Sequence, residues 1–344
     1  MGKWYDVPED MDSNVVYSRI RLVRNWADYP FPGKMTKEQS QELTERLHET
    51  IKEVGALDDT KYRYVNMERL SELDKRALWE RKAINGSMVK KNDTAGLFLS
   101  EDERVSIAIN GDDHVRIQVV EKGMGLLECY RRADRIDDFI SVKIEYSFDE
   151  KYGYLTAFPT NVGTGLRASV IIHLPLLSRK KNFNSLVTDM ARFGTSIRGV
   201  AGEGSENYGS FYQVSNQRTL GQTEKDIVDL VYKAAAELDV QERRLKKDAL
   251  NKRPVVMADE CYKSYGVLKY ARRMNGKDSM EFLSQIMSGL TNGILETEDL
   301  CSIYSLILES QPANLLSRAE MPLNKEELEV ARAEFLRKHL PESH

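Results

Sequence analysis

Apolar residues alternate with polar ones over residues 95–120, whereas beyond about residue 255 they recur only at helical spacing. The first pattern predicts paired strands and the second a group of helices. The whole pattern predicts strands at 15–24, 104–109, 114–119, 152–158, 167–174, 195–200 and 210–215, and helices at 36–54, 71–84, 123–139, 181–193, 222–250, 259–274, 278–290, 297–310 and 324–339. We therefore expect an α+β fold, with an antiparallel β-sheet flanked by helices over residues 1–253 and a small all-helical domain over 254–344.

Local signals mark the ends of several elements. Thr36 and Gln39 have the spacing of a capping box, which predicts the start of the first helix. Asn110-Gly111 is a turn signal between two alternating runs and predicts a hairpin. The charged stretch 241–253 is either the exposed end of the long helix or a joint between domains, and we favour the exposed helix.

Composition excludes several classes of protein. The 344 residues include 50 Lys+Arg and 54 Asp+Glu, a net charge of −4, which argues against a nucleic-acid-binding surface. Cys129, Cys261 and Cys301 are far apart and form no CxxC pair, so neither a zinc site nor a disulfide framework is indicated. No signal peptide and no apolar run of about 20 residues is visible, and we expect a cytoplasmic protein that does not enter membranes.

Arginines on predicted strands are the first candidates for chemistry. Arg19 and Arg21 point to the same face of a strand, where they repel each other unless an anion or carboxylates lie between them. On the strand near residue 115, alternation places Asp112, His114 and Arg116 on one polar face. Taken alone, each group is more often a set of ordinary ion pairs or the solvated side of a sheet than a functional site.

Two glycine-rich segments add to this set. Residues 158–167 contain a tight turn that allows close backbone approach and leads into Arg167. Residues 198–206 place Arg198 beside an acidic, glycine-rich loop that includes Glu203. Several arginines and a carboxylate without a P-loop lysine indicate a polyphosphate site, because guanidinium groups bind phosphate oxygens in pairs and stay charged.

The segments SRIRLVRN (18–25), SEDERVSIAINGDDHVRIQ (100–118) and GYLTAFPTNVGTGLRASV (153–170) occur in an order that resembles the phosphagen (guanidino) kinase family. RGVAGEGSENYGSFYQVSNQRTLGQTEKDIV (198–228) and YKSYGVLKYAR (262–272) extend the similarity to its bacterial branch of protein arginine kinases. The resemblance covers residues 12 to 340. It implies transfer of the γ-phosphoryl group of ATP to arginine side chains of proteins.

The resemblance also implies roles for individual residues. It assigns nucleotide binding to Ser18, Arg19, Arg21, Arg116, Arg167 and Arg198. It assigns the two carboxylates that orient and deprotonate the acceptor guanidinium to Asp112 and Glu203. Mg²⁺ would be held by phosphate oxygens and water, so no protein metal cluster is expected.

Three departures from the family pattern concern the acceptor side and the tail. Phe158 stands where the family has a reactive cysteine, and Asp112 stands where a glutamate is usual. The Arg-Asp-x-x-Arg-Ala motif that binds phosphoarginine in the tail is matched by Glu326-Glu327-Leu328-Glu329-Val330-Ala331, from which the arginines are absent. We therefore expect the phosphoarginine pocket to be lost.

By the same resemblance, the partners are protein substrates with exposed arginines, a zinc-binding activator protein and a Clp-type ATPase, with homodimerisation through the tail. The setting is protein quality control under stress. Two alternatives remain open. The first is a nucleotide-binding pseudokinase or adaptor, which Phe158 and Asp112 suggest. The second is a kinase of a small free guanidino compound.

Overall fold

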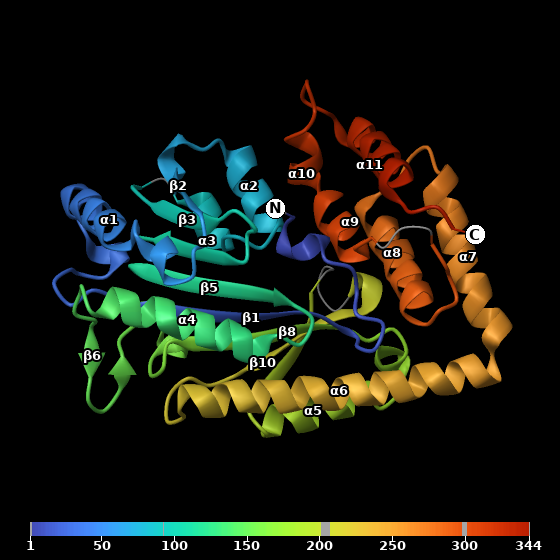
Figure 1. Cartoon of the computed structure of the whole chain (residues 1–344), viewed down its shortest axis with the longest axis horizontal. Helices are drawn as coiled ribbons and strands as arrows, with labels where there is room; N and C mark the ends of the chain where they lie inside the picture. The colour runs from blue at the N-terminus through green and yellow to red at the C-terminus, as the bar shows by residue number, and fades with distance from the viewer. Residues whose placement is uncertain (1, 92, 201–206, 298–300, 344) are drawn as a thin grey trace.

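A computed structural model describes residues 2–91, 93–200, 207–297 and 301–343, and shows one large antiparallel sheet with helices packed on it (Figure 1). The strand order is β2-β3-β4-β5-β1-β8-β10-β9. The strands are β1 (Val15–Arg24), β2 (Tyr62–Asn66), β3 (Gly96–Ser100), β4 (Val105–Ile109), β5 (Val115–Lys122), β8 (Leu166–His173), β9 (Thr195–Gly199) and β10 (Phe211–Asn216). A separate two-stranded hairpin pairs β6 (Phe148–Asp149) with β7 (Gly153–Tyr154).

The helices fall into two groups along the chain. The first comprises α1 (Lys37–Ile51), α2 (Glu72–Glu80), α3 (Gly86–Lys90), α4 (Leu126–Ser141), α5 (Phe183–Arg192) and α6 (Glu224–Lys252). The tail comprises α7 (Pro254–Tyr270), α8 (Gly276–Thr291), α9 (Ile303–Glu309), α10 (Pro312–Leu316) and α11 (Lys325–His339). No helix among the described residues is long and apolar enough to cross a membrane. The predicted α+β class is confirmed.

Alternation in the central strands separates an apolar face from a polar one. Ile20 and Leu22 of β1 and Ile117 of β5 are fully buried in the core beneath α1, α4 and α6. Each such side chain contributes about 1.5–3 kcal/mol relative to an exposed one. Arg19 and Arg21 therefore project from the opposite face of the sheet.

A second apolar core joins the sheet to the tail. Trp4 and Tyr17 have ring centroids 5.0 Å apart, and Tyr17 lies 5.5 Å from Tyr304 of α9. Phe211 of β10 and Leu336 of α11 belong to the same cluster. The tail helices thus pack on residues that come from both ends of the sequence.

Two carboxylates from outside the tail cap its short helices. Glu9 accepts hydrogen bonds from the first backbone N–H groups of α9 at 2.9 and 3.1 Å. Glu80 of α2 accepts from those of α10, both at 3.0 Å. These N–H groups have no partner within their own helix, so the caps tie the tail to the segment before β1 and to α2.

The charged end of α6 is less exposed than expected. Glu242 and Lys246 are buried, although Arg243 and Lys247 are exposed. The Glu242 carboxylate accepts hydrogen bonds from the backbone N–H groups of Leu176 and Leu177, shortly after β8, at 3.0 and 2.7 Å. The helix therefore runs under the tail with one polar side turned inward.

Candidate active site

The two arginines of β1 lie at the centre of the polar face of the sheet. Arg19 donates to the hydroxyl of Ser169 at 3.2 Å and to the side-chain carbonyl of Gln213 at 3.0 Å. The Nε atom of Arg21 is buried without a hydrogen-bond partner among the described residues. Both side chains are therefore held by neutral groups or by none.

Arg116 and Arg167 come from the strands on either side of β1. Arg116 of β5 donates to Gln118 at 3.3 Å. Arg167 of β8 donates to backbone carbonyls of Thr160 and Asn216, both at 2.8 Å. These partners fix the position of the guanidinium groups without neutralising their charge.

Mutual repulsion is the main electrostatic feature of this face. Within the described part of the chain, no carboxylate lies within ion-pair distance of any arginine predicted to bind nucleotide. Burial, followed by the charges of Arg19, Arg116 and Arg167, lowers the pKa of Arg21 well below its usual value. Burial and Arg19 likewise lower the pKa of Arg116 to about 10. A polyanion would relieve this repulsion.

A cavity of about 170 Å³ opens among these groups. Its walls include Arg21, Arg116 and Arg167, together with Asp112 and Phe158. The structure thus brings three of the predicted phosphate-binding arginines next to one predicted catalytic carboxylate and next to the residue that replaces the family cysteine. Phe158 is half-exposed at this place.

The two neighbouring aspartates before β5 are held differently. Asp112 accepts hydrogen bonds from the side chains of Asn85 and Ser87, both at 2.8 Å. One oxygen of Asp113 accepts from Asn25 and from the backbone N–H of Ala157, both at 2.7 Å, and the other has no partner among the described residues. Burial raises the pKa of Asp113. Asp113 therefore fixes the chain just before Phe158.

Close backbone contacts explain the glycines of the 158–167 turn. Gly163 has a φ of +112°, and a Cβ there would lie 2.3 Å from the carbonyl oxygen of Thr219. Gly165 has a φ of +65°, and a Cβ there would lie 2.6 Å from the carbonyl oxygen of Val23. The glycines thus allow the turn to approach the protein's own backbone closely, and Gly165 packs the turn directly on β1.

Other predicted residues lie apart from this cavity. Ser18 is buried on β1, where its hydroxyl donates to the carbonyl of Gly123 at 2.8 Å. Arg198 is exposed on β9. The pKa of Arg167 is lowered mainly by the burial of Arg167 itself and further by the charge of Arg198. Glu203 lies outside the described residues.

His114 does not share a face with Arg116 as alternation predicted. It precedes β5 and is fully buried, and its ring contacts the backbone N–H of Trp26 and the carbonyl of Pro30, both at 2.9 Å. The strand begins only at Val115, so the two-residue period does not extend back to it.

Lys82 and Asn85, which were not predicted to contribute, reach the site from the segment after α2. Burial and the charge of Arg19 lower the pKa of Lys82 to about 8, and Asn85 holds Asp112. Lys82 lies near the end of the predicted helix 71–84 and Asn85 comes directly after it, in a segment without a motif. Only the tertiary fold brings this segment beside β1 and β5.

The donor set suits a metal bound through the nucleotide. No group of three or more His, Cys, Asp or Glu residues in the described ranges could hold a metal ion. Arginines do not ligate cations, and Asp112 already accepts two hydrogen bonds. A divalent ion here would take its ligands from phosphate oxygens and water.

Comparison with known proteins agrees with this geometry. Residues 42–245 match the family model described as ATP:guanido phosphotransferase, C-terminal catalytic domain. The chain belongs to the ATP:guanido phosphotransferase family. Residues 254–344 match the model of the protein-arginine kinase McsB C-terminal domain.

Relatives of this family member extend over almost its whole length. It is 38% identical over 322 residues to the protein-arginine kinase of Caldanaerobacter subterraneus subsp. tengcongensis, covering 94% of this chain and 95% of the relative. It is 36% identical to that of Bacillus subtilis, covering 99% and 93%. A crystal structure of lombricine kinase shares the fold with a TM-score of 0.61 at 23% identity, covering 72% of each chain.

The tail carries part of the family motif two residues beyond the expected match at Glu326–Ala331. Leu328-Glu329-Val330-Ala331-Arg332-Ala333 keeps the acidic residue, the second arginine and the alanine of Arg-Asp-x-x-Arg-Ala. Arg332 is buried and donates to the carbonyls of Ser310 and Met274, both at 3.0 Å. One arginine of the motif is thus present, and the first is replaced by leucine.

Proposed function

We propose that this protein is a protein-arginine kinase that transfers the γ-phosphoryl group of ATP to arginine side chains of proteins. The observation that supports it best is the cluster of uncompensated arginines beside Asp112. Relatives that are named protein-arginine kinases and match nearly the whole chain support the choice of acceptor.

In this proposal the arginines bind and position the triphosphate. Phosphoryl transfer requires alignment and charge neutralisation more than covalent catalysis, and Arg19, Arg21, Arg116, Arg167 and Arg198 would supply both. Mg²⁺, bound through the phosphate oxygens, would neutralise further charge there. Ser18 would contribute through the buried strand that carries Arg19 and Arg21.

Asp112 and Glu203 would act on the acceptor. A guanidinium is a poor nucleophile while protonated, and a pair of carboxylates can orient it and accept its proton. The guanidino nitrogen then bonds to the γ-phosphorus while the bond from that phosphorus to the ADP oxygen breaks. Phe158 would form the apolar wall of the acceptor site in place of the family thiol.

The wider setting follows from the same family membership. We propose a cytoplasmic enzyme that marks proteins for a Clp-type protease, with a zinc-binding activator and a homodimer formed through the tail. We also propose that residues 1–253 and 254–344 are the catalytic and tail domains.

The decisive experiment is incubation of the purified chain with Mg-ATP and casein, followed by phosphoarginine mapping by mass spectrometry under conditions that preserve the acid-labile N–P bond. We expect phosphoarginine with the wild type and none with Glu203→Gln. ATP binding without transfer would favour the pseudokinase. Rapid phosphorylation of free arginine would favour the small-molecule kinase.

A further inference from the structure

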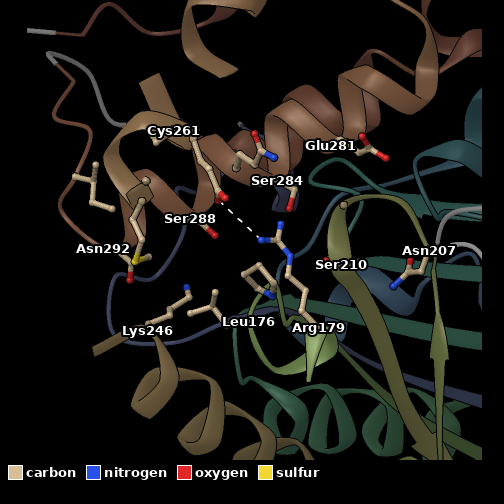
Figure 2. Close-up of a pocket in the computed structure, with 17 residues that line it drawn as sticks. Leu176, Arg179, Asn207, Ser210, Lys246, Cys261, Glu281, Ser284, Ser288 and Asn292 are labelled. Atoms are coloured by element: carbon tan, nitrogen blue, oxygen red, sulfur yellow. Dashed lines mark ion pairs between the residues drawn. The ribbon is translucent and has the colours of Figure 1, made fainter. Parts of the chain in front are cut away.

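A second cavity lies between the long helix α6, the turn after β8, and the tail helices α7 and α8 (Figure 2). Its volume is about 320 Å³, at the lower end of the range for sites that bind small molecules. It shares no lining residue with the cavity among the arginines of the active site. A ligand here would therefore occupy a site separate from the one proposed for the nucleotide.

The face of α8 that lines this cavity is polar, although a helix face turned toward the protein interior is normally apolar. Ser284, Ser288 and Asn292 recur on it at intervals of four residues. The hydroxyl oxygen of Ser288 and the amide nitrogen of Asn292 are buried and have no hydrogen-bond partner among the described residues. Buried polar atoms of this kind are costly unless a ligand or water satisfies them.

Lys246 of α6 supplies a positive charge at the same end of the cavity. Its side chain is 6% exposed. Its Nζ donates to the hydroxyl of Thr291 at 3.3 Å, and no carboxylate lies within ion-pair distance of it in the described part of the chain. Burial lowers its pKa, against the opposing effect of Glu242 and Asp239. An anion at this place would stabilise the charged lysine.

The nearby carboxylates are engaged by other groups. Glu242 accepts two backbone N–H groups, and Asp239 accepts from the backbone and side chain of Asn14 at 2.6 and 2.9 Å and pairs with Arg243 at 3.1 Å. Glu260 is paired with Arg179 across the cavity mouth at 3.9 Å, as the dashed line in Figure 2 shows. This long, exposed pair leaves the Arg179 guanidinium able to turn toward a bound anion.

We propose that this cavity binds a small phosphate-bearing ligand. The phosphate would accept hydrogen bonds from Lys246, Asn292 and Ser288, and Arg179 would close on it from the mouth. These groups are all donors, and a phosphate offers several acceptor oxygens at once. Glu281 lies at the opposite end of the cavity, where its negative charge disfavours a long polyanion such as a nucleoside triphosphate.

Hydrogen exchange measured by mass spectrometry on the full chain tests this site directly, with millimolar inorganic phosphate as the probe and sodium chloride at equal ionic strength as the blank. We expect slower exchange in peptides covering 281–292, by roughly tenfold at a phosphate concentration ten times the dissociation constant. Peptides that cover the active-site arginines report separately on phosphate bound there.

Variants of two lining residues, compared with a control variant on α6, show whether the protection by phosphate arises in this cavity. Lys246→Met and, should that variant fold poorly, Asn292→Leu are expected to abolish the protection over 281–292 and to leave any protection near the arginines. Lys233→Met, which removes an exposed lysine from the same helix, is the control and should behave as the wild type. Unchanged exchange over 281–292 in the wild type would show that the cavity does not bind phosphate. Protection that survives both variants would show that phosphate acts on these peptides from another place.

Discussion

Arg21 and Arg24 occupy one strand, three residues apart, yet their surroundings are opposite. Arg24 pairs with Asp137 at 2.6 Å and with Glu224 at 3.2 Å, and its guanidinium lies 3.7 Å from the centre of the Tyr154 ring. Burial would lower the pKa of Arg24, but these partners raise it overall. Arg21 has no such partner in the described residues. Arg24 therefore has a structural role, whereas Arg21 is available to bind an anion.

This contrast gives a paired prediction. Arg21→Met should lower kcat/KM for protein phosphorylation by about 10²–10³-fold and leave the free energy of unfolding unchanged or increased, because a repelled charge is removed. Arg24→Met should cost about 3–5 kcal/mol, because it strands Asp137 without its buried partner. Urea unfolding and steady-state kinetics on both variants check this. A loss of stability in Arg21→Met would argue against an uncompensated charge.

A second prediction concerns Phe158 and the thiols. Burial raises the pKa of Cys261 to about 11 and, with Glu9, that of Cys301 to about 12, and it also raises that of Cys129. Thiolate is the reactive form, so iodoacetamide at neutral pH should not inactivate the wild type.

Phe158→Cys should restore a reactive thiol at the acceptor site. We expect a higher kcat, an unchanged KM for ATP, and new sensitivity to iodoacetamide that Mg-ATP with substrate slows. Phe158→Leu, which removes the ring without adding a thiol, is the control. An increase in kcat with leucine as well would assign the effect to side-chain volume.

At the residue scale, sequence could predict the arginine face because a period of two fixes which side of a strand each residue occupies. It could not predict that Lys82 and Asn85 join the site, since no motif marks the end of the predicted helix 71–84 or the residue after it. It also could not foresee that Ser18, adjacent to Arg19, has its hydroxyl bonded to Gly123.

At the scale of elements, the buried side chain of His114 fixes the start of β5 through its hydrogen bonds to the backbone of Trp26 and Pro30. Burial lowers the pKa of His114 to about 4, against an ordinary value of 6.5, although the carbonyl of Pro30 opposes the shift. The folded protein therefore keeps the ring neutral at a pH where the unfolded chain binds a proton. Its contribution is complete above pH 6.5 and is lost as the pH falls toward 4.

The third prediction follows from the lowered pKa of His114 in the folded protein. Between neutrality and pH 5, protonation of the unfolded His114 should cost about 2 kcal/mol of unfolding free energy. His114→Gln should be less stable at neutral pH but should lose correspondingly less on acidification. Urea titrations of both proteins at the two pH values check this. Parallel losses would assign the acid sensitivity to other groups.

Most elements were predictable because their periods are clear, as in β1 and α6. The strand expected at 152–158 was wrong, since only Gly153–Tyr154 pairs there and a short 3-10 turn follows at Pro159–Asn161. β2 and α10 were missed because five residues each are too few to show a period. The predicted helix at 297–310 includes residues 298–300, which lie outside the described part.

At the scale of the whole molecule, the sheet and the tail share a core. Trp4, Tyr17 and Phe211 pack with Tyr304 and other side chains of the tail helices. A chain cut at the predicted domain boundary would expose this cluster to water.

The fourth prediction tests that boundary. The fragment 1–253 should bind a hydrophobic dye, aggregate more readily and melt below the full chain. Adding Trp4→Ser to the fragment should reduce dye binding, because a large exposed ring is removed. A monomeric fragment that melts at the temperature of the full chain would show that the two parts are independent.

The caps on α9 and α10 also bear on how such proteins can recombine. Glu9 and Glu80 lie early in the chain, but the helices that they cap lie near its end. A chimera that takes only the tail from a relative would therefore inherit helices whose caps remain with the recipient. Exchange of the tail between relatives should therefore succeed only when the N-terminal segment that carries Glu9 and Glu80 is transferred with it.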